Sequence, residues 1–82
     1  LALRGWIALE VMNLADHFGW ADARGTMISL AISHQTLAEI VGASRQQVTE
    51  YLNEFDREEL ILREGRRIIV NAKRLRKVIA KP

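Results

Sequence analysis

The opening segment of the chain carries apolar residues at the spacing of one amphipathic helix. In LRGWIALEVMNLADHF, residues 3–18, successive apolar side chains are one, three or four positions apart, and they are Trp6, Ile7, Val11, Leu14, Ala15 and Phe18. Such spacing places them on one face of a helix. Gly19 follows at the position of a C-terminal cap. The pattern predicts a helix whose apolar stripe packs into a core, with a surface that covers a neighbouring domain as the alternative.

The next segment combines loop and strand character. Residues 20–25, WADARG, end in a glycine and are typical of a loop. Residues 26–32, TMISLAI, contain β-compatible side chains and predict a short strand. A helix is disfavoured there because the segment is short and follows a loop.

Two helices joined by a tight turn are predicted after this strand. Ser33 is suited to cap the N-terminus of a helix over residues 34–41. Gly42 can end that helix because glycine tolerates the left-handed backbone that a tight turn requires. Ser44 and Gln47 have the spacing of a Ser-x-x-Gln capping box, which starts a second helix over residues 44–59.

The last segment predicts a hairpin and a final helix. Residues 60–70, LILREGRRIIV, hold two β-rich runs around Glu64 and Gly65, a pattern that favours a hairpin. Asn71 can cap a helix over residues 72–80, and the side chains expected to face inward are Leu75, Val78 and Ile79. The fold class is therefore mainly α with a small β-hairpin. One domain over residues 1–82 is expected, because 82 residues suffice for a single modest core.

The two helices around Gly42 satisfy the packing rules of a helix-turn-helix. Counted from His34, five positions are apolar because they seal the helices together, one is small where the helices cross, and one is glycine. In chain order these positions hold Leu37, Ala38, Val41, Gly42, Ala43, Val48 and Tyr51. With the hairpin behind it, the motif predicts a winged helix-turn-helix: the helix-turn-helix over residues 34–59 and the wing over residues 60–70.

Hydrogen-bonding side chains gather in the first turns of the second helix. In this motif the N-terminal part of that helix enters the major groove of DNA. The outward residues expected to read bases are Arg45, Gln46, Thr49 and Glu50, while Val48, Tyr51, Leu52 and Phe55 hold the helix to the core. The alternative is that these side chains are ordinary solvated helix surface. The motif disfavours this alternative more strongly for Arg45 than for Gln46.

The charge of the chain is segregated along the sequence. Residues 1–62 contain four arginines against nine acidic residues, a net charge of −5, whereas residues 63–82 contain eight basic residues against one acid, a net charge of +7. A basic region of this density suits a polyanionic partner. A solvated, salt-bridged surface helix is the open alternative.

Composition excludes several classes of function. The chain has no cysteine and only two histidines, which lie far apart, so neither a disulfide framework nor a metal site is expected. It lacks a run of about 18 apolar residues, a signal peptide, a glycine-rich phosphate loop and a nucleophile–histidine–acid set. We therefore expect a cytoplasmic protein that is not an enzyme, has no membrane partner and holds no cofactor in these residues.

The segment ISHQTLAEIVGASRQQVTEYLNEFDREELI, followed by REGRRIIV, resembles the DNA-binding domain of the cyclic-AMP receptor protein/FNR family of bacterial transcription regulators. The contiguous match runs from Ile32 to Val48, and with the preceding helix and the wing it covers nearly the whole chain. The resemblance implies sequence-specific binding of a homodimer to a double-stranded DNA operator, with RNA polymerase as a further candidate partner. In this family an effector-binding β-roll and a dimerisation helix precede the domain. Because the chain starts at Leu1, we expect a fragment without them, and a cyclic nucleotide, a haem-bound gas, an iron–sulfur cluster or no effector stay open.

The resemblance also assigns roles to single residues. Arg45 matches an arginine that binds guanine, and a bidentate arginine–guanine pair is the commonest specific contact in the major groove. Gln46 and Glu50 stand where the family usually has glutamate and arginine, and Thr49 stands where the oxygen-sensing branch has serine, so the usual half-sites are not assumed. The residues expected to contact the DNA backbone are Ser33, His34, Gln35, Ser44, Arg63, Arg66 and Arg67. For His34, a solvated or capping role is the alternative.

Two other functions are compatible with the same fold. One is a winged-helix module used for protein–protein interaction, and the other is a different winged-helix DNA-binding family, such as a metal- or antibiotic-responsive regulator. Arg45 and the basic wing favour DNA binding, whereas Glu39, Glu50 and Glu54 count against it because carboxylates repel phosphates. The contiguous match disfavours the second alternative.

Overall fold

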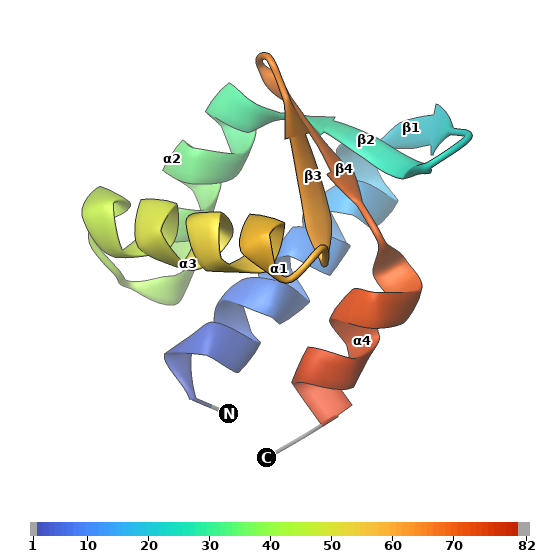
Figure 1. The fold of residues 1–82 in the computed structure, drawn as a ribbon. Helices are drawn as coiled ribbons and strands as arrows, with labels where there is room; N and C mark the ends of the chain where they lie inside the picture. The colour runs from blue at the N-terminus through green and yellow to red at the C-terminus, as the bar shows by residue number, and fades with distance from the viewer. Residues whose placement is uncertain (1, 81–82) are drawn as a thin grey trace.

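The computed structural model describes the backbone of residues 2–80 and, within that range, the side chains of residues 2–29 and 34–79. Along this part of the chain the elements are α1 (Leu3–Phe18), β1 (Trp20–Asp22), β2 (Gly25–Ser29), α2 (Leu30–Val41), α3 (Arg45–Arg57), β3 (Ile61–Glu64), β4 (Arg67–Val70) and α4 (Ala72–Ala80) (Figure 1). The strands form one antiparallel sheet in the order β1-β2-β4-β3. The predicted fold class, a winged helix-turn-helix, is confirmed.

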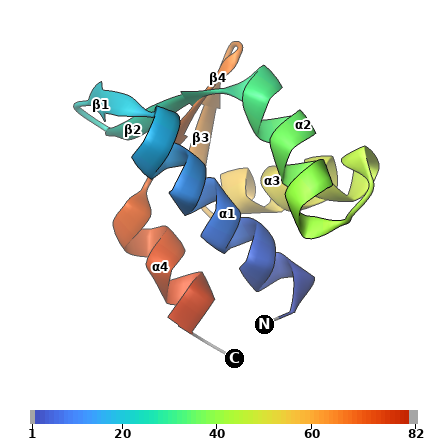
Figure 2. The ribbon, with the colours of Figure 1, turned by 180° about the vertical axis from the view of Figure 1, so that it is seen from behind.

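Helix α1 packs its apolar stripe into the core, as the sequence predicted. It packs against α2 and α4, and Figure 2 shows it running between them. Ile7 and Val11 are fully buried, but the two aromatic residues of the predicted stripe are not, because Trp6 is 47% exposed and Phe18 is 64% exposed. Ala8 lies on the buried face instead, where a small side chain lets neighbouring helices approach closely.

The sheet has one face on the core and one face turned away from it. Side chains on one strand alternate between the two faces, and the inner set is Ile28, Ile61, Ile68 and Val70. On the outer face the register places Trp20, Met27, Ile69 and Leu62 in one row across all four strands. Met27 and Ile69, in the middle of this row, are at most 5% exposed. Neighbouring side chains of the outer face therefore shield them from solvent, and no helix is needed for this.

The segment between α1 and α2 corrects two sequence-based expectations. The sequence predicts a loop over residues 20–25, but Trp20–Asp22 is strand β1, paired with β2 through a short turn. A strand of three residues shows no alternation that a pattern could reveal. Gly25 lets β2 approach β4 closely, because a Cβ there would lie 2.4 Å from the carbonyl oxygen of Val70.

The start of α2 is the second correction. The strand predicted over residues 26–32 ends at Ser29, and the helix predicted from residue 34 begins at Leu30, so Ser29 rather than Ser33 is the N-cap residue. The reason lies in β4. Ser29 pairs with Arg67, the first residue of β4 after the wing turn. Beyond Ser29 none of the described strands continues the pairing, and a helix satisfies the backbone groups instead.

Helix α3 ends two residues before the predicted boundary, through local hydrogen bonds. The amide of Leu60 donates to the carbonyl of Phe55 at 2.9 Å, and the amide of Glu59 donates to the carbonyl of Asp56 at 3.1 Å. This pattern is a Schellman motif. Glu59 takes the left-handed conformation, φ 61°, that glycine usually provides at this position. Leu60 is thereby turned into the core, where β3 begins.

The predicted wing and final helix are present. Strands β3 and β4 are joined by Gly65 and Arg66, so the turn lies one residue later than the Glu64–Gly65 position expected from sequence. Asn71 accepts a hydrogen bond from the amide of Arg74 at 3.1 Å and caps α4. Leu75 is fully buried.

Candidate nucleic-acid interface

The turn between α2 and α3 has the geometry expected of a helix-turn-helix. Gly42 is left-handed, with φ 68° and ψ 27°, and a Cβ at this position would meet no atom within 4 Å. The glycine is therefore required by its backbone conformation and not by lack of space. Leu37 and Val48 are fully buried on the two facing helices, and Ala38 and Tyr51 pack against the same core. The predicted seal between the helices is confirmed in these side chains.

The N-terminus of α3 is held by the predicted capping box. The Ser44 hydroxyl accepts from the amide of Gln47 at 3.1 Å, and the Gln47 side-chain oxygen accepts from the amide of Ser44 at 3.1 Å. Both side chains thus satisfy backbone groups that a helix start leaves unpaired. The Ser44 hydroxyl, expected to contact the DNA backbone, is engaged inside the protein.

Helix α3 has one buried and one exposed face. Val48, Leu52 and Phe55 are fully buried, while Arg45, Gln46 and Glu50 are exposed. In Figure 1 α3 and the β3–β4 hairpin face the viewer, and in Figure 2, from behind, α1 lies in front of them. The outward face of α3 is therefore on the side of the domain away from α1.

The exposed residues of α3 differ in how free their side chains are. The Gln46 amide donates to the Glu50 carboxylate at 3.3 Å, one helical turn further on. The Arg45 side chain makes no hydrogen bond or ion pair with any residue that the structure describes. Arg45 is thus the cation of this helix face whose donors are all available to a partner.

Thr49 is less available than the sequence suggested. It is half-buried, its hydroxyl lies 2.9 Å from the carbonyl oxygen of Arg45, and it also lies 3.2 Å from Nδ1 of His34. The sequence had placed Thr49 and His34 on two different DNA contacts, and the structure brings them together.

The His34 ring is turned into the protein. Its Nε2 is buried and has no hydrogen-bond partner among the described residues. Burial lowers the pKa of His34 from its ordinary value, and the positive charges of Arg45 and Arg63 lower it further. The ring is therefore held neutral over a wider pH range than a free histidine.

Two further residues of α2, Gln35 and Ser33, were expected to contact the DNA backbone. Gln35 is exposed, and its amide donates to the Glu39 carboxylate at 2.7 Å. The backbone of Ser33 lies inside α2, but its side chain lies outside the described part of the structure, so its expected role stays a prediction.

The three wing arginines point in three directions. Arg63 is directed at α3, where it donates to the Asn53 side chain and lies 3.7 Å from Asp56. Arg67 lies over the Trp20 ring, with its guanidinium carbon 5.5 Å from the ring centre. Arg66, in the turn itself, is exposed and has no partner among the described residues. Only Arg66 of the three therefore projects freely from the wing.

Acidic residues near α3 are largely paired. Glu54 and Glu58 both bind Arg4 of α1, with 2.8 Å between Arg4 Nε and Glu54 Oε1. Glu39 and Glu50 accept from glutamine amides of their own helices. The repulsion expected from Glu54 is thus reduced by a cation that no local sequence pattern indicated.

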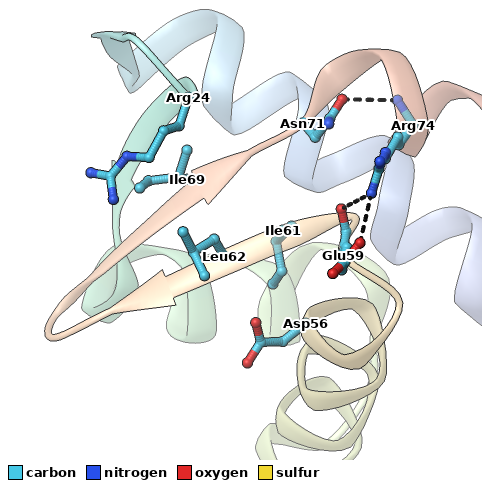
Figure 3. A pocket seen from close by; sticks show the side chains of 8 residues that line it. All are labelled: Arg24, Asp56, Glu59, Ile61, Leu62, Ile69, Asn71 and Arg74. Atoms are coloured by element: carbon cyan, nitrogen blue, oxygen red, sulfur yellow. Dashed lines mark hydrogen bonds and ion pairs between the residues drawn. The ribbon is translucent and has the colours of Figure 1, made fainter.

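Figure 3 shows a pocket of about 320 Å³ at the base of the wing, between the end of α3 and the start of α4. Its charged residues are Arg24, Asp56, Glu59 and Arg74. Each is already paired: Glu59 with Arg74 at 3.1 Å, Asp56 with Arg63, and Arg24 with Asp22. The pocket therefore offers no unpaired charge to a ligand.

The described residues offer no candidate for two further kinds of site. No three or more histidine, acidic or cysteine side chains within residues 2–80 are grouped so that they could hold a metal ion. None of the helices in this range is long and apolar enough to cross a bilayer.

Comparison with known proteins agrees with this geometry. The family model described as Crp-like helix-turn-helix domain matches residues 6–78. Over 67 residues the chain is 27% identical to the CRP-like cAMP-activated global transcriptional regulator of Mycobacterium tuberculosis, a match that covers 82% of this chain and 30% of that protein.

Solved structures give the same result. A CRP-family transcriptional regulator of Thermus thermophilus has a TM-score of 0.81 and 27% identity, over 96% of this chain and 40% of that one. The CO-dependent transcription factor CooA of Carboxydothermus hydrogenoformans has a TM-score of 0.79 over 96% of this chain and 37% of that one, and at 21% identity it shows the fold alone. The chain thus spans between 30% and 40% of the length of these three relatives.

Proposed function

The chain belongs to the Crp-like helix-turn-helix domain family, and on that premise we propose that it binds double-stranded DNA sequence-specifically as the output domain of a transcription regulator. Helix α3 enters the major groove with its first turn, and the wing lies against the DNA backbone. Each contact can be assigned either to base reading or to backbone positioning.

The observation that carries this proposal is the state of Arg45. It is exposed in the first turn of α3, its guanidinium has no described partner, and its helix is held by a capping box and a left-handed glycine turn. A planar guanidinium with free donors matches the two acceptors of guanine in the major groove. We therefore assign base reading to Arg45 first, with Gln46 and Glu50 beside it.

Backbone contacts are assigned to residues that lie around this turn. Gln35 and Arg66 are exposed, and their side chains can donate to phosphate oxygens. Arg63 and Arg67 are already anchored on the protein and contribute mainly positive potential.

We also propose that the full protein acts as a homodimer. Two copies of a helix-turn-helix bind half-sites about one DNA turn apart, roughly 34 Å, which doubles the contacts. The names of the relatives, all transcription regulators, support a non-enzymatic role. A cytoplasmic location and RNA polymerase as a further partner are parts of the same proposal. The comparisons give no support to a winged-helix module used only for protein–protein interaction.

Selection from random duplexes tests the proposal. The full-length protein should enrich one sequence and bind it at least about 10³-fold more tightly than a shuffled duplex. The logarithm of the binding constant should fall linearly with the logarithm of salt concentration, by about 0.9 per phosphate contacted.

Two outcomes would count against this function. A protein that enriches no sequence does not read bases, and a binding constant that is independent of salt does not come from phosphate contacts. Arg57→Ala provides the control, because Arg57 is an exposed arginine at the other end of α3 and should leave the selected sequence unchanged.

A further inference from the structure

The Thr49 hydroxyl joins two parts of the helix-turn-helix, the first turn of α3 and helix α2. It lies 2.9 Å from the carbonyl oxygen of Arg45, one turn earlier in α3, and 3.2 Å from Nδ1 of His34 in α2. The gap between His34 and Thr49 is 15 residues, so the contact crosses from one helix to the other. It links the first turn of α3 to α2 at a point distinct from the Gly42 turn.

The direction of each hydrogen bond follows from the number of protons available. A threonine hydroxyl carries one proton, and the short bond to the Arg45 carbonyl uses it, since a carbonyl can only accept. The hydroxyl oxygen must then accept from His34, so Nδ1 carries the ring proton. Nε2 is left as the unprotonated nitrogen, which agrees with its burial and with the neighbouring positive charges of Arg45 and Arg63.

This arrangement leaves neither residue a free proton donor for DNA. The Thr49 hydroxyl gives its only proton to the Arg45 carbonyl and accepts from His34. The His34 ring has one nitrogen bonded to Thr49 and the other buried. A phosphate outside the domain cannot reach the ring without turning it.

We propose that His34 and Thr49 form a positioning pair, which sets the direction of the Arg45 turn on DNA and does not contact DNA itself. The pair acts on the main chain of Arg45 and leaves its guanidinium free. This role for the pair replaces the two expectations from the sequence, that Thr49 reads a base and that His34 binds a phosphate. The proposal rests on the proposed DNA-binding function.

The first test needs no DNA. The ¹⁵N chemical shifts of the His34 ring in the full-length protein should show a proton on Nδ1 and none on Nε2. In Thr49→Val, which keeps the shape and removes the hydroxyl, that preference should weaken. A ring protonated on Nε2 in the unmodified protein would overturn the pair.

The second test measures base preference by selection from random duplexes. Thr49→Val should weaken binding about three- to tenfold, the range for loss of one net hydrogen bond, and should broaden the preference at the base pair that Arg45→Ala broadens. Thr49→Ser keeps the hydroxyl and should stay within about twofold. Thr26→Val, the same change in β2, is the matched control and should alter nothing.

His34 completes a double-mutant cycle. His34→Leu should broaden the preference at the same base pair. The double variant, His34→Leu with Thr49→Val, should bind DNA no more weakly than the single variant that binds more weakly, because both substitutions remove the same interaction. His34→Asn keeps a side-chain N–H donor and should restore the preference even if His34→Leu loses stability.

The outcomes separate the positioning pair from the function on which it rests. Additive losses, a changed preference at a different base pair, or a salt slope reduced by about one unit in His34→Leu would show direct contact with DNA and overturn the pair alone. Failure of the unmodified protein to select any sequence would overturn the proposed function, and the role of the pair on DNA with it.

Discussion

The guanidinium of Arg24, in the turn between β1 and β2, is paired with the carboxylate of Glu64 at the end of β3, 40 residues away along the chain. Arg24 Nε also lies 3.0 Å from Asp22 Oδ1. The hydrogen bond from Arg24 lowers the pKa of Glu64, and Glu64 in turn raises the pKa of Arg24. The pair connects the small β1–β2 hairpin to the wing along the outer face of the sheet.

Breaking this pair should loosen the wing. Arg24→Glu places two carboxylates together, so the amides of β3 and β4 should exchange with solvent faster than in the unmodified protein, as measured by hydrogen exchange. The exchanged pair, Arg24→Glu with Glu64→Arg, should recover protection. Because the pKa of Glu64 is lowered, the pairing is present above its ordinary value of 4.5 and is lost as the pH falls through the lowered value. Equal exchange rates in all three proteins would contradict the link.

Gly42→Ala should destabilise the domain because the turn requires φ 68°. A left-handed backbone costs an alanine about 1 kcal/mol relative to glycine. Urea unfolding should show this loss, and the midpoint of thermal unfolding should fall by roughly 4–8 °C for a domain of this size.

Glu59 provides a control of opposite sign for Gly42. It adopts φ 61° with a side chain, so Glu59→Gly should raise the free energy of unfolding by up to about 1 kcal/mol. Its ion pair with Arg74 is exposed and contributes little. If both variants shift stability in the same direction, backbone conformation does not explain either position.

The stability of the domain should depend on pH through His34. The pKa of His34 is lower in the folded protein than its ordinary value of 6.5. Between those two values the unfolded chain binds more protons than the folded one, so stability is full above about pH 6.5 and is lost as the pH falls through the folded value. Urea midpoints between pH 7.5 and 5 measure this loss.

Replacement of His34 tests this titration. In His34→Gln the slope over the same pH window should disappear. A slope that persists in His34→Gln would show that another group carries the titration.

Arg45→Ala should relax one base pair of each half-site. Loss of a bidentate arginine–guanine contact costs roughly 1–3 kcal/mol and affects discrimination at that position only. Lysine should substitute poorly, because it lacks the planar fork. Binding selection with the full-length protein gives both quantities, and an unchanged selected site in Arg45→Ala would exclude base reading by this residue.

Arg66→Ala should reduce affinity for specific and random duplexes alike. Arg66 is the unpaired arginine of the wing turn among the described residues, so its loss should lower the salt slope by about one unit. Arg63→Ala is the matched control, because Arg63 is directed at Asn53 and Asp56, and its salt slope should stay closer to that of the unmodified protein. A larger change in Arg63→Ala than in Arg66→Ala would reverse this assignment.

Features set by neighbouring residues were predictable from the sequence. The capping box of Ser44 and Gln47, the left-handed Gly42 and the Asn71 cap each depend on residues within one turn of the chain. The helix α1 stripe and the hairpin depend on spacing alone. Such local signals sufficed for the winged helix-turn-helix and for the exposed first turn of α3.

Features set by residues far apart in the chain were not predictable from the sequence. The boundary between β2 and α2 follows from where β4 begins, and β1 forms because β2 offers it an edge. Arg63 was expected to contact the DNA backbone, but Asn53 and Asp56 hold it against α3.

The same division applies to the residues of the candidate interface. The sequence by itself determined that Arg45 begins an amphipathic recognition helix, because capping and apolar spacing are local properties. Only the tertiary structure decided that Arg45 and Arg66 stay free of the described residues while Thr49 and His34 bond to each other. A polar side chain takes whichever partner the fold brings within about 3 Å, and for Thr49 and His34 that partner lies on the other helix of the motif.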